Sequence, residues 1–89
     1  MHNFSVEENL RKIMNKLSRK DPTLFKDLLE KIDEILHCED VDHYKNLRQP
    51  LRHLKRVHIK GPFILTFRYI KGEDKVLFYD FDHHDWIYK

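Results

Sequence analysis

The N-terminal part of the chain has apolar residues every three or four positions, a spacing that predicts two amphipathic helices. The apolar side of the first helix, expected over residues 6–18, consists of Leu10, Ile13, Met14 and Leu17. Ser5 and Glu8 have the spacing of a capping box, which places the start of this helix directly after Ser5. An N-terminal strand is therefore expected to be absent or vestigial.

Asp21-Pro22 predicts the start of a second helix over residues 22–37, because proline fits the first helical position. Its apolar stripe consists of Phe25, Leu28, Leu29, Ile32, Ile35 and Leu36. The two helices follow each other closely, so they are expected to form a hairpin.

After a polar, acidic loop the pattern changes to alternation, which predicts three strands near residues 52–60, 63–70 and 75–82. Gly61-Pro62 separates the first two strands, and a hairpin turn separates the last two. These elements predict an α+β fold with the helical hairpin packed on one face of a small, three- to four-stranded antiparallel sheet. The other face is left free to bind a ligand.

The composition fits a single globular domain over residues 1–89, with 40% hydrophobic and 36% charged residues. Cys38 is the single cysteine, which excludes an intrachain disulfide and a thiolate metal cluster. The seven histidines include no ligand pair at helical spacing, so no metal site is expected. The sequence contains neither a membrane-span pattern nor a secretory signal pattern, and we expect a cytoplasmic protein without membrane contact.

Positive charge is concentrated in residues 45–60, although the net charge of the whole chain is only +2. This segment contains no acid, and its basic residues are Lys45, Arg48, Arg52, Lys55, Arg56 and Lys60. A strand would place Val57 and Ile59 on one face, while Arg56, His58 and Lys60 would project from the other. Cations and an imidazole on one sheet face suit binding a polyanion and moving protons beside a phosphate. A solvated strand face is the simpler alternative.

The order of these parts, together with four short motifs, resembles the RelE/ParE superfamily of toxins from bacterial and archaeal toxin–antitoxin pairs. Lys45-Asn46-Leu47-Arg48-Gln49-Pro50-Leu51 is similar to the family's lysine-leucine stretch before the first long strand. Two family strands are similar to Lys55-Arg56-Val57-His58-Ile59 and to Gly61-Pro62-Phe63-Ile64-Leu65-Thr66-Phe67. The family's terminal motif is similar to His83-His84-Asp85-Trp86-Ile87-Tyr88.

In the RelE branch, this resemblance implies cleavage of messenger RNA in the ribosomal A site, by attack of the RNA's own 2′-hydroxyl on the adjacent phosphate. It implies no metal and no cofactor, and its partners are a small cognate antitoxin, the ribosome and messenger RNA. The reaction needs groups that accept a proton, offset charge on the phosphorane and protonate the leaving oxygen. The residues at matching positions, expected to be catalytic, are Arg56, His58, His84 and Tyr88. Further RNA contacts are expected from Lys45, Arg48, Arg52, Lys55, Lys60 and His83.

Two positions depart from the family pattern. Ile64 stands where the RelE branch usually has a catalytic arginine, and His84 stands where many members have arginine. Histidine lacks a permanent charge but can act as an acid or base near neutral pH, as in YafQ-like ribonucleases. Three alternatives therefore stay open: a ribonuclease toxin, a ParE-like gyrase inhibitor or catalytically weakened relative that only binds protein, and an RNA-binding domain unrelated to toxins.

Overall fold

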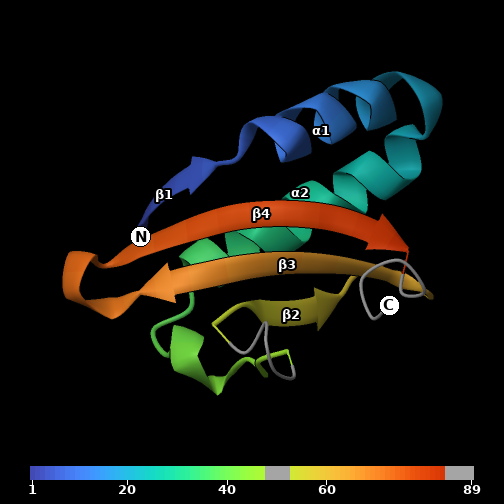
Figure 1. Cartoon of the computed structure of the whole chain (residues 1–89). Helices are drawn as coiled ribbons and strands as arrows, with labels where there is room; N and C mark the ends of the chain where they lie inside the picture. Colours follow the sequence, from blue (N-terminus) through green and yellow to red (C-terminus); the bar gives the residue numbers. More distant parts are fainter. Residues whose placement is uncertain (48–52, 84–89) are drawn as a thin grey trace.

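The computed structural model describes residues 1–47 and 53–83 of the chain. The elements in order are β1 (Asn3–Val6), α1 (Glu8–Lys20), α2 (Pro22–Leu36), β2 (Lys55–His58), β3 (Phe63–Ile70) and β4 (Lys75–His83). Two short 3₁₀ turns, Val41–His43 and Lys71–Glu73, precede β2 and connect β3 to β4. The two helices follow one another: α2 crosses behind β3 and β4, α1 runs along the β1–β4 edge of the sheet, and apolar residues of both belong to one core (Figure 1).

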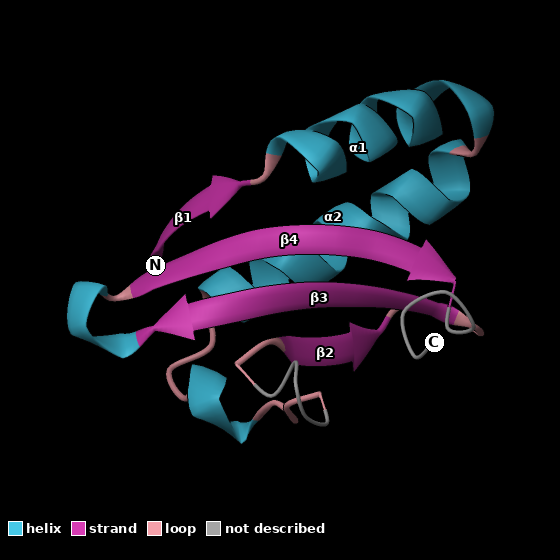
Figure 2. Ribbon diagram, in the orientation of Figure 1, coloured by secondary structure: helices cyan, strands magenta, loops and turns pink. Residues whose placement is uncertain are grey.

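The sheet has four strands in the order β1–β4–β3–β2, and it is mixed rather than purely antiparallel. β2 pairs with β3 and β3 with β4 in antiparallel fashion, whereas β1 pairs with β4 in parallel. Figure 2 shows this arrangement, with β3 and β4 as the long central strands. The predicted α+β fold, a helical hairpin on one face of a small sheet, is confirmed.

The N-terminus differs from its prediction because residues before α1 form a strand. Ser5 lies within β1, opposite Leu77 of β4, and therefore does not cap a helix. α1 begins at Glu8, and the preceding Glu7 makes no side-chain capping bond. The amide of Glu7 instead donates to the carbonyl of Phe78 at 2.9 Å. Pairing with a strand far along the chain satisfies these main-chain groups, which a local capping pattern cannot reveal.

The start of α2 agrees with its prediction. The Asp21 carboxylate accepts a hydrogen bond from the amide of Leu24 at 3.2 Å, and Pro22 occupies the first turn. The helix ends at Leu36, one residue earlier than expected. Among the described residues, neither helix is long and apolar enough to cross a membrane.

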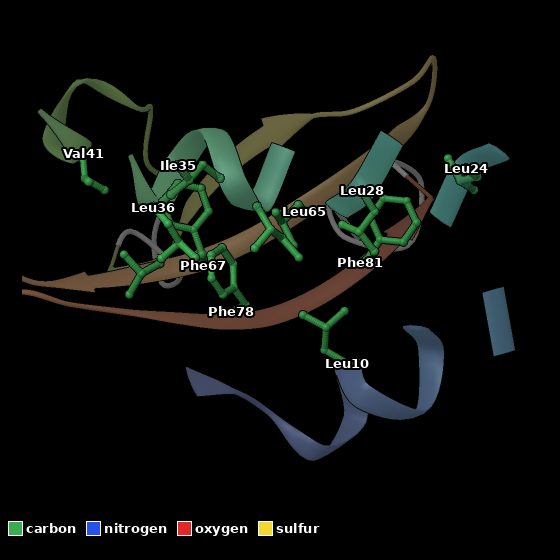
Figure 3. Packing of buried hydrophobic residues seen from close by; sticks show 12 residues of the cluster. Leu10, Leu24, Leu28, Ile35, Leu36, Val41, Leu65, Phe67, Phe78 and Phe81 are labelled. Carbon is green, nitrogen blue, oxygen red and sulfur yellow. The ribbon is translucent and has the colours of Figure 1, made fainter. Parts of the chain in front are cut away.

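The apolar core lies between the helices and one face of the sheet. Its largest fully buried members include Leu10, Leu28, Ile35, Leu65, Phe67 and Phe78. In Figure 3, Leu28 of α2 meets Phe81 of β4, and Leu10 approaches from α1. Because Leu65 and Phe67 face this core, the intervening positions of β3 face the opposite, helix-free side.

One charged side chain, Lys55, is buried on the core-facing side of β2, opposite Phe67 and only 7% exposed. Its ammonium donates to the carbonyls of Asp42 and Tyr44 at 3.4 and 3.1 Å. A third bond reaches Oδ1 of Asn46 at 3.0 Å. These bonds match the three donors of an ammonium group. Lys55 therefore attaches the segment after α2 to β2.

His2 connects the N-terminus to the end of α2 and to the turn before β4. Its Nδ1 lies 2.5 Å from the Asp74 carboxylate, and its Nε2 lies 2.5 Å from the carbonyl of Cys38. Both partners are acceptors, so the doubly protonated imidazolium is the form that makes both bonds. The bond to Cys38, followed by the bond to Asp74, raises the pKa of His2 above 6.5. The same contact with His2 lowers the pKa of Asp74 below 3.8.

Replacing Lys55 with methionine should lower the free energy of unfolding by about 1–3 kcal/mol, because three oxygens lose a buried donor. The matched control is Lys71→Met, since the exposed Lys71 ammonium lies 3.9 Å from the Asp42 carboxylate, which the Lys55 ammonium also approaches at 3.7 Å. This control should change stability by less than about 0.5 kcal/mol. Urea unfolding followed by circular dichroism measures both. An equal loss in the two variants would contradict the role of Lys55.

The stabilising effect of His2 should depend on pH. Because its pKa is raised on folding, its contribution is complete below 6.5 and is lost as the pH rises through the raised value. Asp74, whose pKa is lowered on folding, stabilises the fold above pH 3.8, and this stabilisation is lost as the pH falls below 3.8. His2→Gln should therefore lower the melting temperature by a few degrees near pH 5.5 and by less near pH 9.

The exposed His53 provides a control for this experiment, and His53→Gln should have the same small effect at both pH values. Thermal unfolding at the two pH values measures the difference. A loss of melting temperature in His2→Gln that is equal at both pH values would rule out the charged contact.

Candidate active site

The register between β2 and β3 determines which side chains share the helix-free face. Arg56 lies opposite Thr66, and His58 lies opposite Ile64. These positions alternate with the core-facing residues of both strands, so both pairs face away from the helices. Arg56 and His58 are two residues apart on β2, which separates their Cα atoms by about 7 Å. The structure thus places both on one face, as the alternation predicts.

Lys45 extends this face beyond β2. The amide of Arg56 donates to the carbonyl of Lys45 at 2.9 Å, and Asn46 forms an antiparallel bridge with Lys55. This pairing sets Lys45 directly beside Arg56, on the helix-free face, while Asn46 accompanies Lys55 on the other. Lys45 is exposed and Arg56 is partly exposed.

Arg68 is a further cation on this face, and the sequence alone did not single it out. It follows Thr66 by two positions on β3 and lies opposite Leu77 of β4. It therefore occupies the row next to that of Arg56, on the same face, and its side chain is exposed. The alternation of Ile64, Thr66 and Arg68 along β3 is the sequence pattern from which its position could have been predicted.

β4 gives the same sheet face the opposite charge, through Asp80 and Asp82. The Asp80 carboxylate accepts bonds from the amide of Phe81 at 2.9 Å and from the side chain of Asn9 at 3.3 Å. Burial raises the pKa of Asp80. Asp82 accepts a bond from the amide of His83 at 2.7 Å. The face therefore changes from cationic along β2 to acidic along β4.

Ile64 and Thr66 form the floor between these two sides. They are 0% and 3% exposed, although they lie on the face without helices. The Thr66 hydroxyl donates to the carbonyl of Asp80 at 3.3 Å. Ile64 stands where the resemblance would put an arginine, so this position has a buried apolar side chain next to His58 instead of a charge.

Three residues that were expected to contact RNA are placed elsewhere. Lys55 is buried on the core-facing side, where main-chain oxygens occupy its ammonium. The Lys60 ammonium lies 3.8 Å from the Asp27 carboxylate of α2, because Lys60 follows the end of β2 and the strand alternation no longer applies to it. The ring of His83 packs edge-on against Phe63, with centroids 5.8 Å apart, and Phe63 borders the core.

The remaining predicted site residues, Arg48, Arg52, His84 and Tyr88, lie outside the described residues. Within the described part of the chain, no three metal-ligating side chains gather into a group that could hold an ion. The described candidate site therefore consists of Lys45, Arg56, His58 and Arg68 around a floor of Ile64 and Thr66.

No protein-family model matches the chain. A Methanocaldococcus jannaschii protein named "Putative toxin RelE4" is 45% identical over 89 residues, which cover 100% of this chain and 93% of the relative. A metal-bound toxin from Helicobacter pylori superposes with a TM-score of 0.75 at 17% identity, covering 98% of this chain and 99% of that one. The toxin–antitoxin complex RelBE2 from Mycobacterium tuberculosis gives a TM-score of 0.74 at 21% identity, covering 92% and 96%.

The structural likenesses show the fold, and the full-length identity to the archaeal relative shows the family. This membership excludes the alternative of an RNA-binding domain unrelated to toxins. The chain belongs to the RelE-like branch of the RelE/ParE superfamily of toxins from toxin–antitoxin systems.

Proposed function

We propose that this toxin is a ribosome-dependent endoribonuclease that cleaves messenger RNA without a metal ion. The observation that supports this most strongly is the common placement of Arg56 and His58 on the helix-free face. Lys45 and Arg68 lie on the same face, beside Arg56. Three permanent cations and one imidazole on the same sheet face suit a site that holds a polyanion and transfers a proton.

In the proposed reaction the 2′-oxygen bonds to phosphorus while the bond to the 5′-oxygen breaks. The products are a 2′,3′-cyclic phosphate and a free 5′-hydroxyl. One proton leaves the 2′-hydroxyl and another reaches the departing 5′-oxygen. His58 is assigned one of these transfers, because imidazole both accepts and donates protons near neutral pH. The second transfer is assigned to His84 or Tyr88, on the family resemblance.

The cations have two roles in this proposal. Arg56 offsets the charge that develops on the phosphorane, since a guanidinium offers paired donors to phosphate oxygens. Lys45 and Arg68 lie on either side of Arg56, and they hold the neighbouring phosphates of the same strand. Ile64 has no charge to contribute, so phosphate binding depends more on these flanking cations.

The proposed partners are a small cognate antitoxin, the ribosome and messenger RNA. A toxin–antitoxin complex is among the structures with the same fold, which supports the first of these partners. The substrate is engaged during translation, so the toxin acts in the cytoplasm.

Arg56→Gln and His58→Gln should each lower messenger cleavage by about 10²-fold or more, because each removes charge stabilisation or a proton transfer. Primer extension on a reporter transcript in a translating extract measures the cuts. His53→Gln, an exposed change in the same basic segment, should cut like wild type. Undiminished cleavage in both site variants would reject the assignment.

Arg68→Gln should act mainly on substrate binding. We expect KM to rise by about tenfold with kcat nearly unchanged, because a flanking phosphate contact contributes equally to ground state and transition state. Single-round cleavage on programmed ribosomes at several toxin concentrations separates the two constants. Lys71→Gln, at an exposed lysine in the β3–β4 turn, is the control. A fall in kcat with constant KM would show that Arg68 acts in the chemical step instead.

A second candidate function is toxicity through protein binding alone, and the buried Ile64 at a usual arginine position favours it. A ParE-like toxin of this kind would arrest growth and cause gyrase-dependent DNA damage without cutting messenger RNA. Codon-position-specific cuts by the wild-type protein would exclude it.

A further inference from the structure

Helix α1 carries a second cationic surface. Its exposed basic residues are Arg11, Lys12, Lys16, Arg19 and Lys20. Its single acid, Glu8, lies in the first turn. None of the ion pairs within the described residues involves these five side chains. We call these five residues the α1 basic surface.

The α1 basic surface is arranged in two lines along the helix. Lys12, Lys16 and Lys20 follow one another at intervals of four residues, so they lie above each other over about 12 Å. Arg11 and Arg19 flank Asn15 in the adjacent line. The apolar side of α1, which includes the fully buried Leu10, faces the core. Basic and apolar sides of the helix are therefore separate.

Helix α2 shows how the same protein builds a solvated helix face. Its charged residues have both signs, and Lys31 pairs with Glu34 at 2.9 Å. In α1, by contrast, like charges four residues apart repel one another. Arg19 and Lys20 gain from the helix dipole at the C-terminal end, but the cations earlier in the helix do not. An external anion would offset this repulsion.

We propose that the α1 basic surface binds the phosphate backbone of double-helical RNA. Ammonium and guanidinium groups in a straight line fit a regular array of phosphates, and Asn15 adds hydrogen-bonding capacity. α1 contains no aromatic residue, so it lacks the stacking platform that single-stranded RNA binding uses. Its exposed side also lacks the large apolar anchors typical of a protein partner.

The α1 basic surface and the candidate active site lie on different parts of the molecule. α1 packs at the β1–β4 side of the sheet, whereas β2 forms the opposite edge (Figure 1). One toxin molecule therefore contacts two RNA segments at once, a messenger strand and a duplex. The identity of the duplex as ribosomal RNA rests on the proposed function, but binding itself needs no cleavage.

The test is fluorescence anisotropy with a labelled 2′-O-methyl RNA duplex, which has no 2′-hydroxyl and cannot be cut. Lys12→Gln/Lys16→Gln is compared with Lys26→Gln/Lys71→Gln, which removes the same charge from exposed positions outside α1. The α1 variant should bind about tenfold more weakly, and its slope of log affinity against log salt should fall by about 2. Glutamine keeps the helix propensity of α1, so both variants should melt like wild type.

The control variant should retain wild-type binding and salt slope. Equal weakening in both variants would show an effect of net charge alone and overturn the proposal. The proposal would also be overturned if polyglutamate, at matched charge, displaced the labelled duplex as effectively as unlabelled duplex does. That result would favour an acidic protein partner. Wild-type toxin that binds the duplex through the α1 basic surface but does not cleave messenger RNA would reject the proposed function while supporting this inference.

Discussion

The pairing of β2 with β3 is the constraint on which the rest of the structure depends. Side chains alternate between the two faces of a strand, so a shift by one residue would turn Arg56 and His58 beneath the helices and Val57 outward. The shift is costly because it would expose apolar surface and bring charge into the core. Lys55 fixes the same register from the other side, since its three bonds hold it next to the segment after α2.

This register determines which side chains lie on each of the two faces of the sheet, and the two faces differ in composition. Apolar side chains from both helices fill one face, and the opposite face collects cations along β2 and β3 and acids along β4. Residues that stabilise the fold are therefore mostly different from those proposed to hold RNA. Lys55 illustrates this separation: it belongs to the basic segment in sequence, but its burial makes it a structural residue.

The helical hairpin, the alternation of β2 and the α+β class could be predicted, because each depends on local spacing. The strand β1 could not, since its partner β4 lies far along the chain and Ser5 matched a capping box by coincidence. Lys60 lies near Asp27 of α2 because alternation does not extend past the end of β2, and the packing of His83 against Phe63 could not be predicted from the terminal motif alone. Arg68 was not predicted because it lies outside the basic segment, residues 45–60. Alternation along β3 nevertheless places it on the same face as Thr66.

The central claim is that the cations gathered by this register promote attack by the RNA's own 2′-hydroxyl. A messenger carrying a single 2′-deoxynucleotide on the 5′ side of the cut position tests it most directly, on ribosomes stalled at that codon. We predict that the all-RNA messenger is cut to a 2′,3′-cyclic phosphate end and that the deoxy-substituted messenger is not cut at all. Cleavage of the deoxy-substituted messenger at the same position and rate would contradict the account.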